Sequence, residues 1–271
     1  MATLRVTILG CGSSGGVPRA DGDWGACDPN EAKNRRSRCG LLLQKWSGAA
    51  GAPEQATSVL IDTPPELRQQ LAAAGCARLD GVIISHDHAD QTNGFDDIRA
   101  FFLRQRREIP VLMDASSAHT FMRRFGYAFE AGPGYPAIAH RREYLEPLAS
   151  VAIAGPGGEL EIMPLDQDHG FSRSLGFRVG PLGYSNDLVA MPAPSFAALA
   201  GLELWIVDAL RDRPHPTHAS VDQALGWIAR LQPKRAVLTN MHIDLDYAAL
   251  KARLPGAVEP AYDGWSADLA L

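Results

Sequence analysis

The chain has 271 residues, of which 46% are hydrophobic, and its formal net charge at pH 7 is -5. This acidic balance argues against a protein that coats nucleic acid, because such proteins carry a basic surface. No apolar run approaches the ~20 residues that cross a bilayer, so we expect no membrane partner.

Length and cysteine usage indicate the class of protein. We expect one α/β domain spanning residues 1–271, since folds of this class often reach this size as a single unit. The cysteines, Cys11, Cys27, Cys39 and Cys76, are widely spaced, and the N-terminus lacks the apolar core of a signal peptide. These features predict a cytoplasmic protein with reduced thiols. The oligomeric state is left open, a homodimer included.

The first predicted strand covers residues 4–9 and runs into a glycine-rich loop at residues 10–18. Such a loop lets the backbone approach a ligand closely. Its spacing is not that of a Walker phosphate loop, and no lysine follows the glycines. We therefore predict a bend near the active site, with Ser14 as a substrate-binding residue.

A basic run precedes the strand predicted at residues 40–44, and it contains Lys33, Arg35, Arg36 and Arg38. Two interpretations stay open. A run of charge is usually a solvated face. Alternatively, the run clamps an anion, since the planar guanidinium group matches the oxygens of a phosphate. In the second case Arg35, Arg36 and Arg38 bind substrate.

A βαβ order is predicted next, with strand, helix and strand at residues 58–62, 66–74 and 81–84. Directly after the second strand come His86, His88 and Asp90. A strand alternates its faces, so the two histidines can point the same way, and a turn can bring Asp90 back toward them. Imidazole and carboxylate ligands together suit zinc, manganese or iron(II).

The run from His86 to Gln91, His-Asp-His-Ala-Asp-Gln, resembles the H-x-H-x-D-H motif of the metallo-β-lactamase superfamily, with Gln91 in place of the last histidine. The Gly-x-Gly-x-x-x-Gly-Val-Pro opening at residues 10–18 is similar to that of the PhnP-like branch. That branch includes the phosphodiesterase that opens phosphoribosyl 1,2-cyclic phosphate. The resemblance covers nearly the whole chain. It implies an α/β fold of the αββα sandwich type, a metallo-β-lactamase-like fold in which two packed mixed β-sheets are flanked by helices.

The same resemblance implies roles for three further residues. Asp62, at the end of a predicted strand, would orient a histidine ligand by hydrogen bonding. His169 would be the third metal histidine beside His86 and His88. Asp187, which closes a Tyr-Ser-Asn-Asp segment, would bridge two metals or cap one.

The predicted catalytic residues are His218 and Asp90. His218 lies before the helix predicted at residues 221–231, and the resemblance implies a general acid or a phosphate binder at this position. Asp90 is predicted as a metal ligand as well. The segment at residues 126–146 mixes aromatic, glycine, proline and basic residues without a period, and we predict a cap or substrate loop over the site.

Two positions depart from the superfamily pattern. Gln91 and Asn240 stand where relatives carry histidines, and both belong to the second metal site. His242, two residues further on, is a candidate replacement. The predicted metal ligands are therefore His86, His88, Asp90, Gln91, His169, Asp187, Asn240 and His242. We expect a divalent metal, zinc or manganese, with one or two ions per chain.

These observations predict a metal-dependent hydrolase. The expected activity is that of a phosphodiesterase acting through a metal-bound hydroxide on a small cyclic phosphate or a nucleotide-like phosphodiester. One alternative is another hydrolase of this fold, such as a thioesterase or an RNA-processing nuclease, although the pI near 5.9 counts against the nuclease. Another is a nucleotide-binding protein whose second metal site has degenerated.

Overall fold

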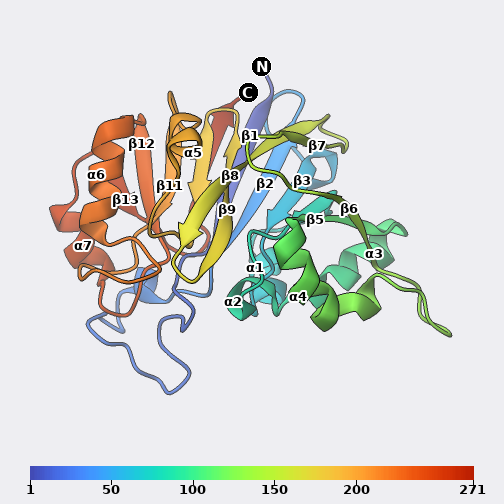
Figure 1. Cartoon of the computed structure of the whole chain (residues 1–271), viewed down its shortest axis with the longest axis horizontal. Coiled ribbons are helices and arrows are strands. Elements are labelled where there is room, and N and C mark those ends of the chain that lie inside the picture. The colour runs from blue at the N-terminus through green and yellow to red at the C-terminus, as the bar shows by residue number, and fades with distance from the viewer.

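The computed structural model describes residues 1–271 and contains two seven-stranded β-sheets (Figure 1). The first sheet has the strand order β14-β1-β2-β3-β4-β5-β6. Its strands are β1 (Thr3–Gly10), β2 (Gly40–Trp46), β3 (Thr57–Ile61), β4 (Gly81–Ile83), β5 (Ile109–Met113), β6 (Ala139–Tyr144) and β14 (Ser266–Ala270). Neighbours from β14 to β3 are antiparallel, and those from β3 to β6 are parallel. Because β14 pairs with β1, the two ends of the chain lie side by side (Figure 1).

The second sheet has the order β13-β12-β11-β10-β9-β8-β7. Its strands are β7 (Val151–Ile153), β8 (Leu160–His169), β9 (Ser172–Val179), β10 (Leu182–Ser185), β11 (Leu204–Asp208), β12 (Arg235–Thr239) and β13 (Val258–Pro260). Neighbours from β7 to β10 are antiparallel, and those from β10 to β13 are parallel. Both sheets are therefore mixed.

The main core lies between the two sheets. Strands that are covered on both faces consist of nearly continuous apolar runs, as β11 does with Leu-Trp-Ile-Val, all buried. Side chains of both sheets meet in one apolar cluster, in which Ile61 and Ile83 accompany Phe177 and Ile206. Burial of apolar surface contributes about 25 cal/mol per Å², so this layer is the principal source of stability.

Helices cover the outer faces of both sheets (Figure 1). The first sheet carries α1 (Leu67–Ala73), α3 (Arg99–Gln105) and α4 (Ala115–Phe125), and the second carries α6 (Val221–Leu231) and α7 (Tyr247–Arg253). Shorter elements are α2 (Ala89–Thr92), α5 (Ala193–Ala197) and the 3-10 turns at Ala32–Asn34, Pro53–Gln55, Phe95–Ile98 and Gly126–Ala128. The predicted αββα sandwich is confirmed. None of the helices is long and apolar enough to cross a membrane.

The segment at residues 126–146 differs from the predicted cap. Ala139–Tyr144 forms β6, which pairs with β5 at the edge of the first sheet. Most β6 side chains are exposed, so this edge strand lacks the apolar pattern from which strands are predicted. Strand β8 extends as far as His169, so that this histidine belongs to the strand itself.

Several strands of both sheets end at one edge of the sandwich (Figure 1), and this edge holds five predicted site residues together with Asp208. Each residue closes a strand or follows it within three positions: Asp62 (β3), His86 (β4), His169 (β8), Asp187 (β10), Asp208 (β11) and Asn240 (β12). Parallel strands bring their carboxyl ends to a common edge, which is where ligands bind in open α/β sheets. The topology therefore gathers residues that lie far apart in the sequence.

Candidate metal centre

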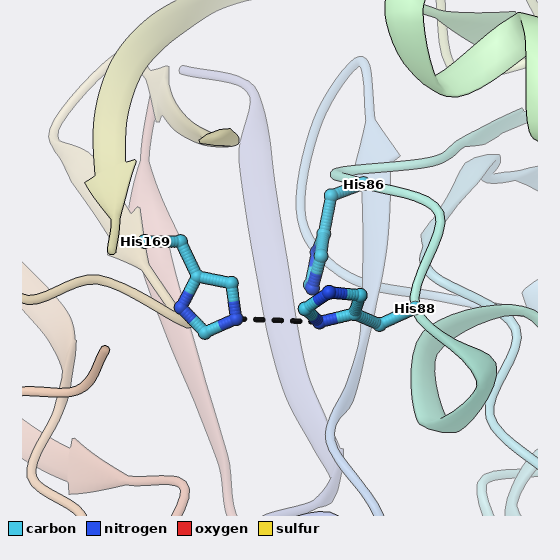
Figure 2. Close-up of side chains that lie close together, drawn as sticks. All are labelled: His86, His88 and His169. Atoms are coloured by element: carbon cyan, nitrogen blue, oxygen red, sulfur yellow. Dashed lines mark hydrogen bonds between the residues drawn. The ribbon is translucent and has the colours of Figure 1, made fainter. Parts of the chain in front are cut away.

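Three histidines from the two sheets point toward one another (Figure 2). His86 and His88 follow β4, and His169 closes β8. Their ligand atoms all lie within 4.8 Å of one another, and Nε2 of His169 is 3.3 Å from Nδ1 of His88. Three converging imidazoles form a donor set that suits zinc and similar divalent metals.

The environment of His86 fits a metal ion. Its side chain is buried, and its Nε2 has no hydrogen-bond partner. Burial lowers the pKa of His86 well below its usual value, and the neighbouring His88 and His169 lower it further. The imidazole is therefore neutral, which is the form that binds metals. A buried polar atom without a partner costs free energy, and a metal ion would satisfy it.

Asp62 and Ser85 fix the orientation of His86. The backbone N–H of Ser85 donates to Oδ1 of Asp62 over 2.7 Å, and the Ser85 hydroxyl donates to Oδ2 over 2.8 Å. The same hydroxyl oxygen lies 3.0 Å from Nδ1 of His86 and accepts its proton, since the hydroxyl's own hydrogen is given to Asp62. This places the proton on Nδ1 and leaves the lone pair of Nε2 for a ligand. Burial raises the pKa of Asp62 to about 7, against the hydrogen bonds from Ser85.

A second cluster adjoins the first and consists of His169, Asp187 and His218, whose ligand atoms lie within 4.8 Å of one another. Asp187 is buried, and its backbone adopts the left-handed conformation with φ of +54°. Its two carboxylate oxygens accept amide N–H groups, from Asn240 over 3.1 Å and from Asn186 over 2.6 Å. Asn240 therefore presents its nitrogen to the carboxylate in this arrangement.

The carboxylate of Asp208 holds His218 in place. No role was predicted for Asp208 from the sequence. Its Nδ1 lies 3.0 Å from Oδ2 of Asp208 and 3.6 Å from Oδ1 of Asp187. Burial alone would lower the pKa of His218, but the hydrogen bond to Asp208 and the charges of both carboxylates outweigh it and raise this pKa to about 9. The imidazolium form is therefore the stable one in this arrangement. Nε2 of His218 has no partner within the protein.

Residues 57–243 match the family model described as the beta-lactamase superfamily domain. The chain belongs to the metallo-β-lactamase superfamily. Among solved structures, a crystal structure titled as a new diphosphatase from the PhnP family has a TM-score of 0.86 and 27% identity, covering 99% of this chain and 98% of that chain. The predicted PhnP-like character is thus confirmed.

More distant members of the superfamily share the fold. Zinc-bound PqqB from Methylobacterium extorquens has a TM-score of 0.71 at 16% identity, covering 98% of this chain and 100% of that chain. Human tRNase Z, short form, has a TM-score of 0.64 at 16% identity, covering 97% and 98%. A curated relative, named octanoyltransferase, from Porphyromonas gingivalis is 28% identical over 97% of this chain. This chain spans about half of that relative, 51% of its length.

Asp90 and Gln91 are the last two positions of the superfamily's histidine motif, and both lie in α2. Nε2 of Gln91 donates to Oδ2 of Asp90 over 3.3 Å, while Oε1 of Gln91 is buried without a partner. The charge of Asp90 raises the pKa values of Asp187 and His218, although burial has the largest effect on both. Asp90 therefore lies near the second cluster without belonging to either cluster, and the Oε1 of Gln91 is a further oxygen donor at this position.

His242 does not replace the superfamily histidine that Asn240 displaces. Its Nε2 lies 2.6 Å from Nη2 of Arg19, and its Nδ1 lies 3.1 Å from Oδ2 of Asp244. Both ring nitrogens are therefore engaged outside the two metal-type clusters. The prediction of a replacement ligand is corrected, because the side chain turns toward the glycine-rich loop.

The predicted anion clamp is not formed over the histidines. Arg36 is buried and donates to the carbonyl oxygens of Leu245 and His242 over 2.7 and 3.3 Å, so its role is structural. Arg38 pairs with Glu66 over 2.7 Å. Arg35, Arg36 and Arg38 all line a cavity of about 860 Å³ between β1, β2, α1 and the β14 region, and no histidine lines it. The prediction is corrected for Arg36, because its guanidinium group is buried and donates to backbone carbonyl oxygens.

Sequence reasoning missed Ser85, Asp208 and Arg19. Ser85 directly precedes His86, two residues after the end of β4, and Asp208 closes a buried apolar strand. A polar residue at the carboxyl end of a buried strand indicates a candidate site residue, since such residues meet at the edge of the sheet where ligands bind. Nothing in the sequence separates Arg19 from an ordinary loop arginine.

Proposed function

We propose that this superfamily hydrolase is a phosphodiesterase acting on a small cyclic phosphate or a nucleotide-like phosphodiester. The observation that most supports this proposal is the convergence of His86, His88 and His169, where Nε2 of His86 has no hydrogen-bond partner. The similarity to a PhnP-family diphosphatase supports the choice of phosphate chemistry, since it extends over 99% of this chain. A small-molecule phosphate ester is therefore the proposed substrate.

The proposed resident metal is zinc or manganese. His86, His88 and His169 would hold it, with Asp187 as the adjacent carboxylate. When bound, the metal supplies a Lewis acid for a phosphoryl oxygen and lowers the pKa of water. A second ion would depend on oxygen donors, for which Asp90 and the free Oε1 of Gln91 are the proposed source. Such a donor set favours manganese or magnesium over zinc.

The proposed general acid is His218. Asp208 holds the proton on Nδ1, while Nε2 has no protein partner and is free to meet a substrate oxygen. An imidazolium there would neutralise charge on the phosphoryl group and donate its Nε2 proton to the leaving oxygen. Asp90, partly exposed at the start of α2, is proposed to accept a hydrogen bond from the attacking water.

The test combines metal analysis with a substrate panel. Purified protein is assayed against bis(p-nitrophenyl) phosphate, a 1,2-cyclic phosphate, a nucleoside diphosphate sugar and octanoyl-coenzyme A. We expect turnover of a phosphate substrate that is abolished in His86→Ala. His119→Ala removes an exposed histidine on α4 and serves as the matched control, with unchanged activity. If the protein hydrolyses none of the phosphate substrates in the panel, the proposal is refuted.

The second candidate is a thioester or acyl-group substrate. Its motivation is the 28% identity to the relative named octanoyltransferase, although this chain spans only 51% of that protein. Turnover of octanoyl-coenzyme A without turnover of any phosphate would favour this candidate. Tight binding of a mononucleotide without turnover would instead favour the nucleotide-binding alternative.

A further inference from the structure

The glycine-rich loop forms a tight turn beside the metal centre. The N–H of Gly16 donates to the carbonyl of Ser13 over 2.8 Å, which closes a turn with Ser14 and Gly15 at its centre. The N–H of Ser13 donates to the carbonyl of Met241 over 3.3 Å. Met241 directly follows Asn240, which contacts Asp187, so the turn lies next to the second cluster.

The central residues of this turn present free donors. The N–H groups of Ser14 and Gly15 have no hydrogen-bond partner in the protein, and Ser14 is exposed. Consecutive free N–H groups in a turn form a concave site that attracts anions. The hydroxyl of Ser14 adds a third donor at the same place.

Arg19 lies against this turn. A Cβ atom placed on Gly15 would lie 3.5 Å from Cγ and 3.6 Å from Nε of Arg19. The arginine side chain therefore lies in van der Waals reach of the turn. Nη2 of Arg19 donates to Nε2 of His242 over 2.6 Å, and Nδ1 of the same ring lies 3.1 Å from Oδ2 of Asp244. The chain Asp244–His242–Arg19 fixes the position of the guanidinium group.

Arg19 forms one ion pair, with Asp23, and apart from the contact with His242 its guanidinium N–H groups donate no hydrogen bond. The nearest carboxylate oxygen, on Asp23, is 3.8 Å from Nη1, which exceeds hydrogen-bond distance. A shallow cavity of about 410 Å³ lies beside these donors, lined by Ser14, Gly15, Arg19, Ala20, Asp21 and Arg38. The carboxylate on its wall, that of Asp21, already accepts the N–H of Asp23 over 3.1 Å.

We propose that the turn at residues 13–16 and Arg19 bind a second phosphate group of the substrate. Rigid N–H donors and a pre-positioned guanidinium group recognise phosphate oxygens well. Ser13 contacts Met241 and Arg19 contacts His242, so the turn and Arg19 adjoin the segment that begins at Asn240, beside Asp187. This inference rests on the proposed function and narrows it to substrates with two phosphate groups, such as a diphosphate ester. His242 is a positioning residue that acts through Arg19.

Inorganic pyrophosphate is the binding probe, and calorimetry on the metal-containing protein is the measurement. We expect Arg19→Gln to weaken pyrophosphate binding at least tenfold with unchanged metal content, and Arg19→Lys to recover part of the affinity. Arg235→Gln removes a half-exposed cation from the opposite end of β12 and should bind as the unaltered protein does. Equal affinity of Arg19→Gln and the unaltered protein would overturn the proposal.

Kinetics separate this inference from the proposed function. In Arg19→Gln and His242→Gln we expect KM for a nucleoside diphosphate sugar to rise at least tenfold with kcat within twofold. Kinetics with bis(p-nitrophenyl) phosphate, which has a single phosphate, should stay within twofold. Equal losses on both substrates would contradict a second-phosphate subsite. If the unaltered protein hydrolyses neither substrate, the proposed function fails, while the pyrophosphate titration still decides the subsite.

Discussion

Nδ1 of His218 lies 3.0 Å from Oδ2 of Asp208, a carboxylate that is itself completely buried. The pair joins the loop before α6 to the end of β11, and Nδ1 of His218 also lies 3.6 Å from Oδ1 of Asp187. A buried carboxylate is stabilised by a cation and hydrogen-bond donors, and Asp208 also accepts the N–H of Leu188 over 3.2 Å. The fold therefore stabilises the protonated, positively charged form of His218.

The variant Asp208→Asn tests this pair. Without the carboxylate, the positive charge on His218 loses its principal support, so donation from Nε2 becomes weaker. We expect kcat to fall by about a hundredfold, which is the lower end of the general acid–base contribution. Metal content by elemental analysis should not change, and a variant that loses its metal would show that Asp208 acts on the metal site instead.

Ser85→Ala interrupts the connection between Asp62 and His86. The buried Asp62 loses its hydroxyl donor, and Nδ1 of His86 loses its acceptor. We expect metal affinity to fall about 10- to 100-fold, as for other residues that support metal ligands. Competition with a fluorescent chelator measures it. Ser58→Ala is the control, because the Ser58 hydroxyl is buried without a partner, and its loss should leave metal affinity as it was.

Metal removal should lower thermal stability. The three histidines bind the ion only in the folded chain, so occupancy stabilises the folded state by about 2.7 kcal/mol at a hundredfold excess over Kd. For a chain of this size that corresponds to a fall in Tm of about 5–10 °C after dialysis against a chelator. Calorimetry before and after adding zinc or manganese measures the change. A Tm that neither falls nor recovers would contradict a resident metal.

Arg35 and Arg36 form a matched pair for a stability measurement. Arg36 is buried and donates to two carbonyl oxygens, whereas Arg35 is exposed and lies over the Trp24 ring. We expect Arg36→Ala to lower the free energy of unfolding by about 2–4 kcal/mol. Two carbonyl oxygens lose their hydrogen-bond donor, and a cavity replaces the side chain. Arg35→Ala should cost less than about 1 kcal/mol. Equal effects in urea unfolding would refute the structural role of Arg36.

Most strands could be predicted from local signals, whereas the sandwich architecture and the place of His169 beside His86 and His88 were predicted from the resemblance to the superfamily. Apolar runs gave the strands, and His86, His88 and His169 directly follow or close such runs. Edge strand β6 was not predicted, because most of its side chains are exposed to solvent. Local patterns carry information about strands that are covered, and less about strands at an edge.

The contacts between segments could not be predicted in the same way. Arg36 is close in sequence to Arg35 and Arg38, yet it alone is buried, because Leu245 and His242 offer it carbonyl oxygens from more than 200 positions away. The position of His242 depends on Arg19 in the same manner. Burial and partners of a charged side chain are tertiary properties, and one sequence contains no direct signal for them.

Three of the residues at this edge, Asp62, Asp187 and Asn240, have φ values of +65°, +54° and +61°. Aspartate, asparagine and histidine tolerate this left-handed conformation better than β-branched or bulky residues do. The backbone therefore restricts evolutionary change at these positions before any chemistry is selected. Exchanges among aspartate, asparagine and histidine remain open, so that Asn240 can acquire or lose ligand character in one step without rebuilding the loop.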